Sequence, residues 1–86
     1  MTDAAAQAPI RVLEFRSRPG EKVRMHGHPD YVTYDFNGGK TRFTYPKGDP
    51  AERAAKAGDV VWHKAETHAS ENTGGADIHV LLIELK

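Results

Sequence analysis

Apolar and polar side chains alternate along most of the chain from Ile10 onward, with the period of two that is typical of half-buried β-strands. The stretch 10–16 shows this alternation with one slip, and Pro19-Gly20 ends it with a turn. The alternation resumes over 22–26 and is interrupted at Pro29-Asp30. The N-terminal third therefore predicts two short strands separated by a turn.

The middle of the chain carries a turn signal between two strand-like stretches. Residues 31–36 and 41–45 are rich in aromatic and β-branched side chains, and residues 37–40 between them read Asn-Gly-Gly-Lys. Asn-Gly and Gly-Gly pairs suit tight hairpin turns because both central positions of such turns need positive φ. This pattern predicts a β-hairpin formed by the two stretches.

The segment 51–56, Ala-Glu-Arg-Ala-Ala-Lys, follows a stretch rich in Pro and Gly at 46–50 that breaks the sheet. It has the composition for one helical turn, but it is too short and its side chains are too small to pack a helix. We expect a loop or an irregular edge strand here.

Three further strands complete the pattern, at 60–63, at 66–72 and at 77–85. The last is apolar enough to be buried on both faces. Short strands separated by turn signals, with no substantial helix, predict an all-β fold built as a small antiparallel barrel or sandwich.

The length of 86 residues allows one domain, because a chain this short cannot bury two cores. With 38% hydrophobic and 28% charged residues, the composition is that of a soluble globular domain. Residues 1–9 show no alternating apolar face and lack the features of a secretory signal. We therefore expect a flexible N-terminal tail over 1–9 and a single barrel domain over 10–86.

The charge and composition narrow the expected partners. Twelve Lys and Arg balance twelve Asp and Glu, so nothing attracts the chain to nucleic acid or to an anionic membrane surface. The apolar run at 80–83 is far shorter than a membrane span requires. The absence of cysteine leaves imidazole and oxygen groups as metal ligands and fits a cytoplasmic protein. A small molecule or another protein is the expected partner.

Two motifs of the chain resemble those of the cupin superfamily. The first cupin motif is Gly, five residues, His-x-His, three or four residues, Glu, six residues and Gly. Here Gly20 precedes His26-Gly27-His28 by five residues, and Gly38 follows. The Glu of the motif is missing: counting back from Gly38 its position falls on Tyr31, and counting on from His28 it falls on Val32 or Thr33.

The second cupin motif is Gly, five residues, Pro-x-Gly, two residues, His, three residues and Asn. Gly58 opens the corresponding segment, and His68 and Asn72 close it with the expected spacing between them. The interval is one residue short, and Lys64 and Glu66 stand in place of Pro and Gly. The resemblance covers most of the chain after the tail and implies a cupin-like jelly roll.

Three histidines are the candidate metal ligands. His26 and His28 are two residues apart and so lie on one face of a strand, and His68 from a facing strand would complete a three-nitrogen site. The cupin resemblance implies the same three residues and a divalent metal ion such as Fe, Zn, Mn or Ni. The alternative is that the histidine pair is exposed and merely solvated.

Four other residues are candidates for an additional ligand or for the pocket wall: His63, Tyr31, Asp35 and Trp62. Tyr31, Thr33 and Asp35 share one strand face, which either lines the pocket or faces solvent. If it lines the pocket, Asp35 is the nearest substitute for the missing Glu. Trp62 is expected in the core or at an interface, or stacked on a ligand.

The remaining polar residues have structural interpretations. His79 lies among apolar residues of the last strand and is expected to be packed or solvated rather than a ligand. Asn72 is expected to form hydrogen bonds at a turn or strand end. Glu66, Glu71 and Asp59 lie beside turns, where charges are usually solvated, and they indicate no paired acid and base.

Two functions of different kinds are compatible with the pattern. The first is a metal-dependent enzyme, an oxygenase or isomerase acting on a small organic molecule. The second is a non-catalytic module that binds or senses a small ligand. The absence of the motif's Glu supports this alternative, because the site lacks an anionic metal ligand. A purely structural role is a third interpretation. In each case we expect a homodimer, because a domain this small gains from covering strand edges, above all that of the apolar last strand.

Overall fold

The computed structural model describes residues 8–86, and the expectation for residues 1–7 of the tail lies outside this range. The described chain forms eight strands and no helix. The strands are β1 (Ile10–Ser17), β2 (Lys22–His28), β3 (Tyr31–Asp35), β4 (Gly38–Thr44), β5 (Ala51–Lys56), β6 (Val60–His63), β7 (Glu66–Asn72) and β8 (Ile78–Leu85). Accordingly, residues 8–86 contain no helix of the length and apolarity that crossing a membrane would need.

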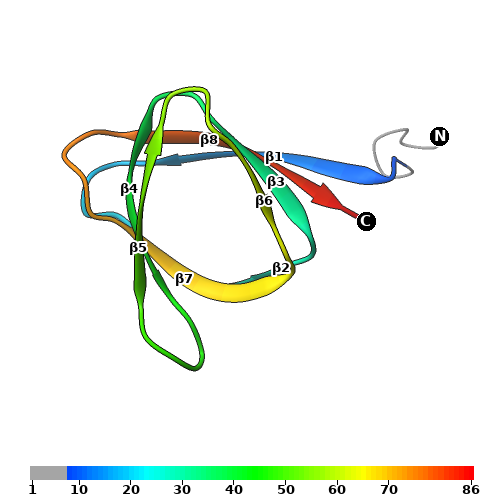
Figure 1. Ribbon diagram of the computed structural model, residues 1–86, viewed down its shortest axis with the longest axis horizontal. Coiled ribbons are helices and arrows are strands. Elements are labelled where there is room, and N and C mark those ends of the chain that lie inside the picture. Colours follow the sequence, from blue (N-terminus) through cyan, green and yellow to red (C-terminus); the bar gives the residue numbers. More distant parts are fainter. Residues whose placement is uncertain (1–7) are drawn as a thin grey trace.

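The strands form two antiparallel four-stranded sheets that face each other (Figure 1). One sheet has the order β1-β8-β3-β6 and the other the order β2-β7-β4-β5. Strands that follow one another in the sequence therefore alternate between sheets in several places, which is the topology of a jelly roll. The expected all-β barrel without substantial helix is confirmed.

The predicted hairpin between 31–36 and 41–45 is wrong. β3 pairs with β6 and β8, whereas β4 pairs with β5 and β7 in the opposite sheet. Gly38 and Gly39 do adopt positive φ, at 74° and 138°. They carry the chain across from one sheet to the other, and a Cβ on Gly38 would lie 2.5 Å from the carbonyl oxygen of Ala55. The local turn signal was correct, but the pairing partner of each strand is set by the rest of the barrel.

The fifth and the last strand test two further sequence predictions. The segment 51–56 is an edge strand, β5, as one of the two expectations had it. β8 lies between β1 and β3, so its backbone is paired on both sides and it has no free edge. The reason given for a homodimer, a bare edge on the last strand, is therefore incorrect. Pro9, placed in the tail by the sequence, accepts a hydrogen bond from the backbone of Lys86.

The interior between the sheets is a cavity of about 390 Å³ rather than a solid apolar core. Among the described residues only two apolar side chains, Tyr31 and Ile78, are buried. Five polar or charged residues are buried as well. The polar ones are Ser17, Asp35, His68, Asn72 and Glu84. The space between the two sheets is therefore hollow and partly polar.

Candidate metal centre

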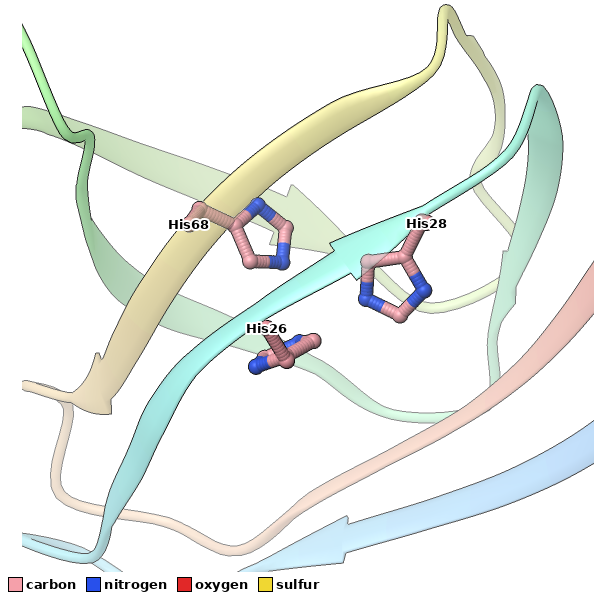
Figure 2. A group of neighbouring side chains, drawn as sticks. All are labelled: His26, His28 and His68. Atoms are coloured by element: carbon pink, nitrogen blue, oxygen red, sulfur yellow. The ribbon is translucent and has the colours of Figure 1, made fainter.

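The structure brings His26, His28 and His68 together on the wall of the cavity. His26 and His28 lie on β2, and His68 lies on the neighbouring strand β7, directly opposite His26 in the ladder. Figure 2 shows the three side chains pointing toward a common space. One ring nitrogen from each lies within 4.8 Å of the others.

A β-bulge in β2 aims these histidines inward. The register of the β2–β7 pair shifts between Val23 and His26, which adds one residue to β2. Because side chains alternate along a strand, an extra residue reverses the parity. Val23 and His26, three positions apart, thus both line the cavity, and Met25 is exposed. The regular alternation expected over 22–26 does not hold at this point.

The second ring nitrogen of each histidine faces an oxygen atom. Nδ1 of His26 lies 2.5 Å from the backbone carbonyl of Arg24, within the bulge, and Nδ1 of His28 lies 2.6 Å from Glu84 Oε2. Nδ1 of His68 lies 3.2 Å from Glu66 Oε1. Since the carbonyl of Arg24 can only accept, His26 Nδ1 carries the hydrogen, and its Nε2 is a free electron-pair donor.

Glu84 is the buried anion behind His28. Its side chain is 3% exposed and also accepts hydrogen bonds from Arg11, the shorter at 2.7 Å. Burial raises the pKa of Glu84, but the hydrogen bonds from His28 and Arg11 outweigh burial and hold the pKa below its usual range. Glu84 is therefore ionised near neutral pH, and it holds His28 with Nδ1 protonated and Nε2 toward the cavity.

His68 is the most buried of the three and is poorly satisfied. The approach of Glu66 is close, but it is not aligned for a hydrogen bond, so buried Nδ1 of His68 has no hydrogen-bond partner. Burial lowers the pKa of His68 to about 4, against the opposing effect of Glu66 and with the help of His26 and His28. The ring is therefore neutral near pH 7, which is the form that binds a metal ion.

Glu66 connects His68 to Tyr31. The hydroxyl of Tyr31 donates to Glu66 Oε1 at 2.7 Å, and the phenol ring is almost fully buried. Burial and then Glu66 raise the pKa of Tyr31, so the hydroxyl stays protonated. Glu66 was expected to be solvated, and this expectation is wrong: it starts β7, is half-buried and contacts Tyr31 and His68.

The register of β3 places its polar face inward. Tyr31, Thr33 and Asp35 all line the cavity, whereas Tyr34 is exposed on the outside. His63 also lines the cavity, where it stacks on Tyr31 with ring centroids 4.4 Å apart and contacts Thr33 Oγ1 at 3.0 Å. Burial lowers the pKa of His63. His63 belongs to the wall beside the three histidines and is not one of the group that they form.

No carboxylate joins the three histidines. Of the three positions for the missing Glu, Tyr31 and Thr33 face the cavity, and the hydroxyl of Thr33 bonds to His63. Asp35 lies four residues beyond Tyr31, roughly 13 Å along the strand, so it lines the pocket at a distance from the cluster. Asp35 is therefore not a substitute for the Glu of the motif.

Three other predictions concern single residues. Trp62 is 53% exposed and does not line the cavity, so its placement in the core and its role in the pocket are wrong, and its place at an interface stays a prediction. Asn72 forms hydrogen bonds with the carbonyls of Ser17 and Ala76, which confirms its expected structural role. His79 lies outside the cluster, bonded to Glu14 at 2.9 Å and stacked on Phe36.

The donor set fits a divalent transition metal ion. Three neutral imidazoles from two adjacent strands suit Zn, Fe, Mn or Ni, and metal ligands are commonly oriented by an oxygen on the other ring nitrogen. Ligand nitrogens of one ion lie about 3–3.5 Å apart, given bonds of about 2.1 Å. The candidate ligand atoms lie within 4.8 Å of one another, and the buried Nδ1 of His68, 3.2 Å from Glu66 Oε1, has no hydrogen-bond partner.

Sequence reasoning missed Glu84 and Glu66. Glu84 carries a signal, because it is the only acidic residue between Ile78 and Leu85 in an otherwise apolar strand. A lone charge in a buried strand needs a partner. Nothing local indicates that the partners are Arg11 and His28, which are 73 and 56 residues away.

Comparisons with known proteins agree with this architecture. No family model and no curated protein matches the sequence. Among solved structures, a cupin domain from Bordetella pertussis Tohama I superposes with a TM-score of 0.81 at 24% identity, covering 90% of this chain and 81% of that one. A predicted oxalate decarboxylase from Thermotoga maritima has a TM-score of 0.65 at 27% identity, covering 100% and 76%.

A third similar structure is a Cupin 2 conserved barrel domain protein from Salinispora arenicola CNS-205. It has a TM-score of 0.68 at 23% identity, covering 100% of this chain and 71% of that one. These structures match 90–100% of this chain, which itself forms two jelly-roll sheets and carries its histidines on β2 and β7. The protein therefore has the cupin fold.

Proposed function

We propose that this protein is a metal-binding cupin in which His26, His28 and His68 hold one divalent ion through their Nε2 atoms. The observation that carries the proposal is the arrangement of oxygens behind the three rings. Nδ1 of His26 contacts the carbonyl of Arg24 and Nδ1 of His28 contacts Glu84, so Nε2 of both rings is left as a donor, and Nδ1 of His68 lies 3.2 Å from Glu66. A merely solvated histidine pair would not require a buried carboxylate such as Glu84 behind it.

The proposed chemistry acts on a small organic molecule inside the cavity. Three neutral ligands leave the ion its full double charge and open coordination positions, which suits polarising a substrate oxygen or binding an anionic group and dioxygen. Tyr31 and His63 line the cavity beside the histidines and would contact a substrate held at such an ion. A metal-dependent oxygenase or isomerase is the enzyme type that this set favours.

A non-catalytic ligand-binding or sensing module is the second candidate. The composition of the cluster favours this candidate. The cluster consists of three histidines and contains no carboxylate that could act as a base. The nearest carboxylates, Glu66 and Glu84, are occupied by Tyr31 and by Arg11 with His28. In this module the metal would anchor a ligand without transforming it.

Elemental analysis tests the shared part of both candidates. The full chain is purified without a histidine tag, dialysed separately against Fe, Zn, Mn and Ni, and its metal content is measured. About one equivalent of one metal is expected. A content near zero for all four metals would remove both candidates. A stoichiometric metal with no turnover across oxygen-dependent and isomerisation assays would favour the binding module.

A further inference from the structure

The end of the cavity away from the three histidines holds two carboxylates. Asp35 ends β3, and Asp59 directly precedes β6. Their backbones are locked together, because Asp35 N–H donates to the carbonyl of Asp59 at 2.9 Å and Gly58 N–H donates to the carbonyl of Asp35 at 2.7 Å. Both residues line the cavity. The two acids therefore face the same interior space from adjacent strand ends.

The carboxylate of Asp35 has no partner in the described part of the chain. The residue is only 8% exposed, no hydrogen bond or ion pair of the described residues reaches its side chain, and its carboxylate oxygens keep accessible surface. Asp59 is partly satisfied, since its Oδ2 accepts the backbone N–H of Lys56 at 2.8 Å. A buried, unpaired acid costs folding free energy unless it serves another purpose. This is the observation that points to a ligand.

The protein supplies no cation of its own to this end. Arg53 is the one Lys or Arg side chain among the described residues that line the cavity. Its guanidinium lies 6.0 Å above the ring of Phe43, and its charge acts on Tyr31 and His63 near the histidines. Burial and then Asp59 raise the pKa of Asp35, which agrees with a carboxylate that no cation compensates.

The walls between the two ends are largely apolar. They include side chains from both sheets, namely Leu13, Phe15, Phe43, Ile78, Val80 and Leu82. A cavity of about 390 Å³ with such walls accommodates a small molecule with an apolar body. The acidic end then selects the polar group that this molecule carries.

We propose that Asp35 and Asp59 form a subsite for the protonated amino group of a small molecule whose apolar body occupies the cavity. An ammonium group donates charge-assisted hydrogen bonds to both carboxylates and removes the cost of burying Asp35. The subsite itself needs no metal. That the opposite end of the same molecule reaches the metal ion rests on the proposed function.

The test compares three probes of one size: 3-phenylpropylamine, 3-phenylpropanol and 3-phenylpropionate. Each is titrated into the ¹⁵N-labelled full chain, without metal and after loading with zinc, while the backbone amide signals of Gly39 and Asp59 are followed by NMR. The amine is expected to bind at least about tenfold more tightly than the alcohol or the acid, since a charge-assisted hydrogen bond contributes enough for that ratio.

Asp35→Asn is the matched variant, and Asp49→Asn, in the exposed loop before β5, is its control. Asp35→Asn should reduce the affinity for the amine to that for the alcohol and leave the affinity for the alcohol unchanged, while Asp49→Asn changes neither. Asp59→Asn provides a second variant if the first does not fold. An amine that binds no better than the alcohol, or equally well to both Asp35→Asn and the parent, would overturn the subsite.

Zinc titration of the same samples separates this proposal from the previous one. If zinc does not bind, and elemental analysis finds no Fe, Mn or Ni either, but the preference for the amine persists, the metal site is wrong and the subsite stands. If zinc binds but the preference for the amine is absent, the subsite is wrong and the metal site stands.

Discussion

His28 and Glu84 join the two sheets of the barrel through a hydrogen bond of 2.6 Å between Nδ1 and Oε2. His28 ends β2 of one sheet, and Glu84 lies in β8 of the other. The same carboxylate binds Arg11 on β1. One buried acid therefore orients a candidate metal ligand and anchors it to the opposite side of the barrel.

Replacing Glu84 with Gln should weaken metal binding by about 10- to 100-fold, the usual effect of losing an oxygen partner behind a metal-bound histidine. The amide keeps the shape but removes the charge that holds His28 Nδ1 protonated. Isothermal titration calorimetry measures the change. Glu14→Gln, which removes the negative charge beside His79, is the control and should leave metal affinity unaltered. Equal affinities for Glu84→Gln and the parent would contradict the orienting role of Glu84.

Replacing His68 with Ala should abolish metal binding as completely as replacing His26 or His28, because two neutral nitrogens hold a divalent ion poorly against water. His79→Ala should bind metal like the parent, since His79 lies outside the cluster. Calorimetry on the four variants checks both statements. Retention of full affinity in His68→Ala, or its loss in His79→Ala, would contradict the assignment. Acidification should also weaken binding, because protons compete for the ligand nitrogens.

Asp35→Asn should raise the thermal stability of the metal-free protein at neutral pH. The pKa of Asp35 is raised in the folded state by burial and by Asp59. The folded protein therefore holds this proton more tightly than the unfolded chain, and stability is lost as pH rises through the folded pKa. The gain from the substitution should shrink as pH falls below that pKa. Melting curves at neutral and at acidic pH measure it, with Asp49→Asn as control. An equal gain at both pH values would show that the charge is not its cause.

The homodimer stays a prediction, with a different surface from the one first expected. The last strand has no free edge, but the outer face of its sheet carries a row of apolar register partners: Val12, Ile83, Val32 and Trp62. Val12 and Trp62 are more than half exposed. We expect a second copy of the chain to cover this row, since exposed apolar area is unfavourable. Sedimentation should show a dimer at about 50–100 µM, well above typical dissociation constants.

Trp62→Gln tests this surface, because it removes the largest apolar side chain of the row. The variant should shift the sedimentation profile toward monomer. Met25→Gln, at an exposed position of the other sheet, should leave it unchanged. A parent protein that is monomeric throughout this concentration range would refute the dimer itself.

The sequence by itself determined the strands and the type of site. Alternation and turn residues are local properties, so most strands lie close to where the pattern places them. β5 is an edge strand, which was one of the two structures expected for 51–56. The spacing of His26 and His28 placed both rings on one face, because strand geometry fixes the period. The resemblance to cupin motifs added His68, and the structure brings it to the same point.

Only the tertiary structure decided which strands pair and what lies behind each ligand. Asn37-Gly38-Gly39 indicates a turn, but whether a turn joins partners in one sheet or crosses between sheets depends on contacts far away in the chain, here those of β8 and β7. The inward register of Asp35 and the bulge before His26 depend on the same distant pairing. Glu84 reaches His28 across 56 residues, a separation at which no local pattern carries information, because only closure of the barrel brings the two together.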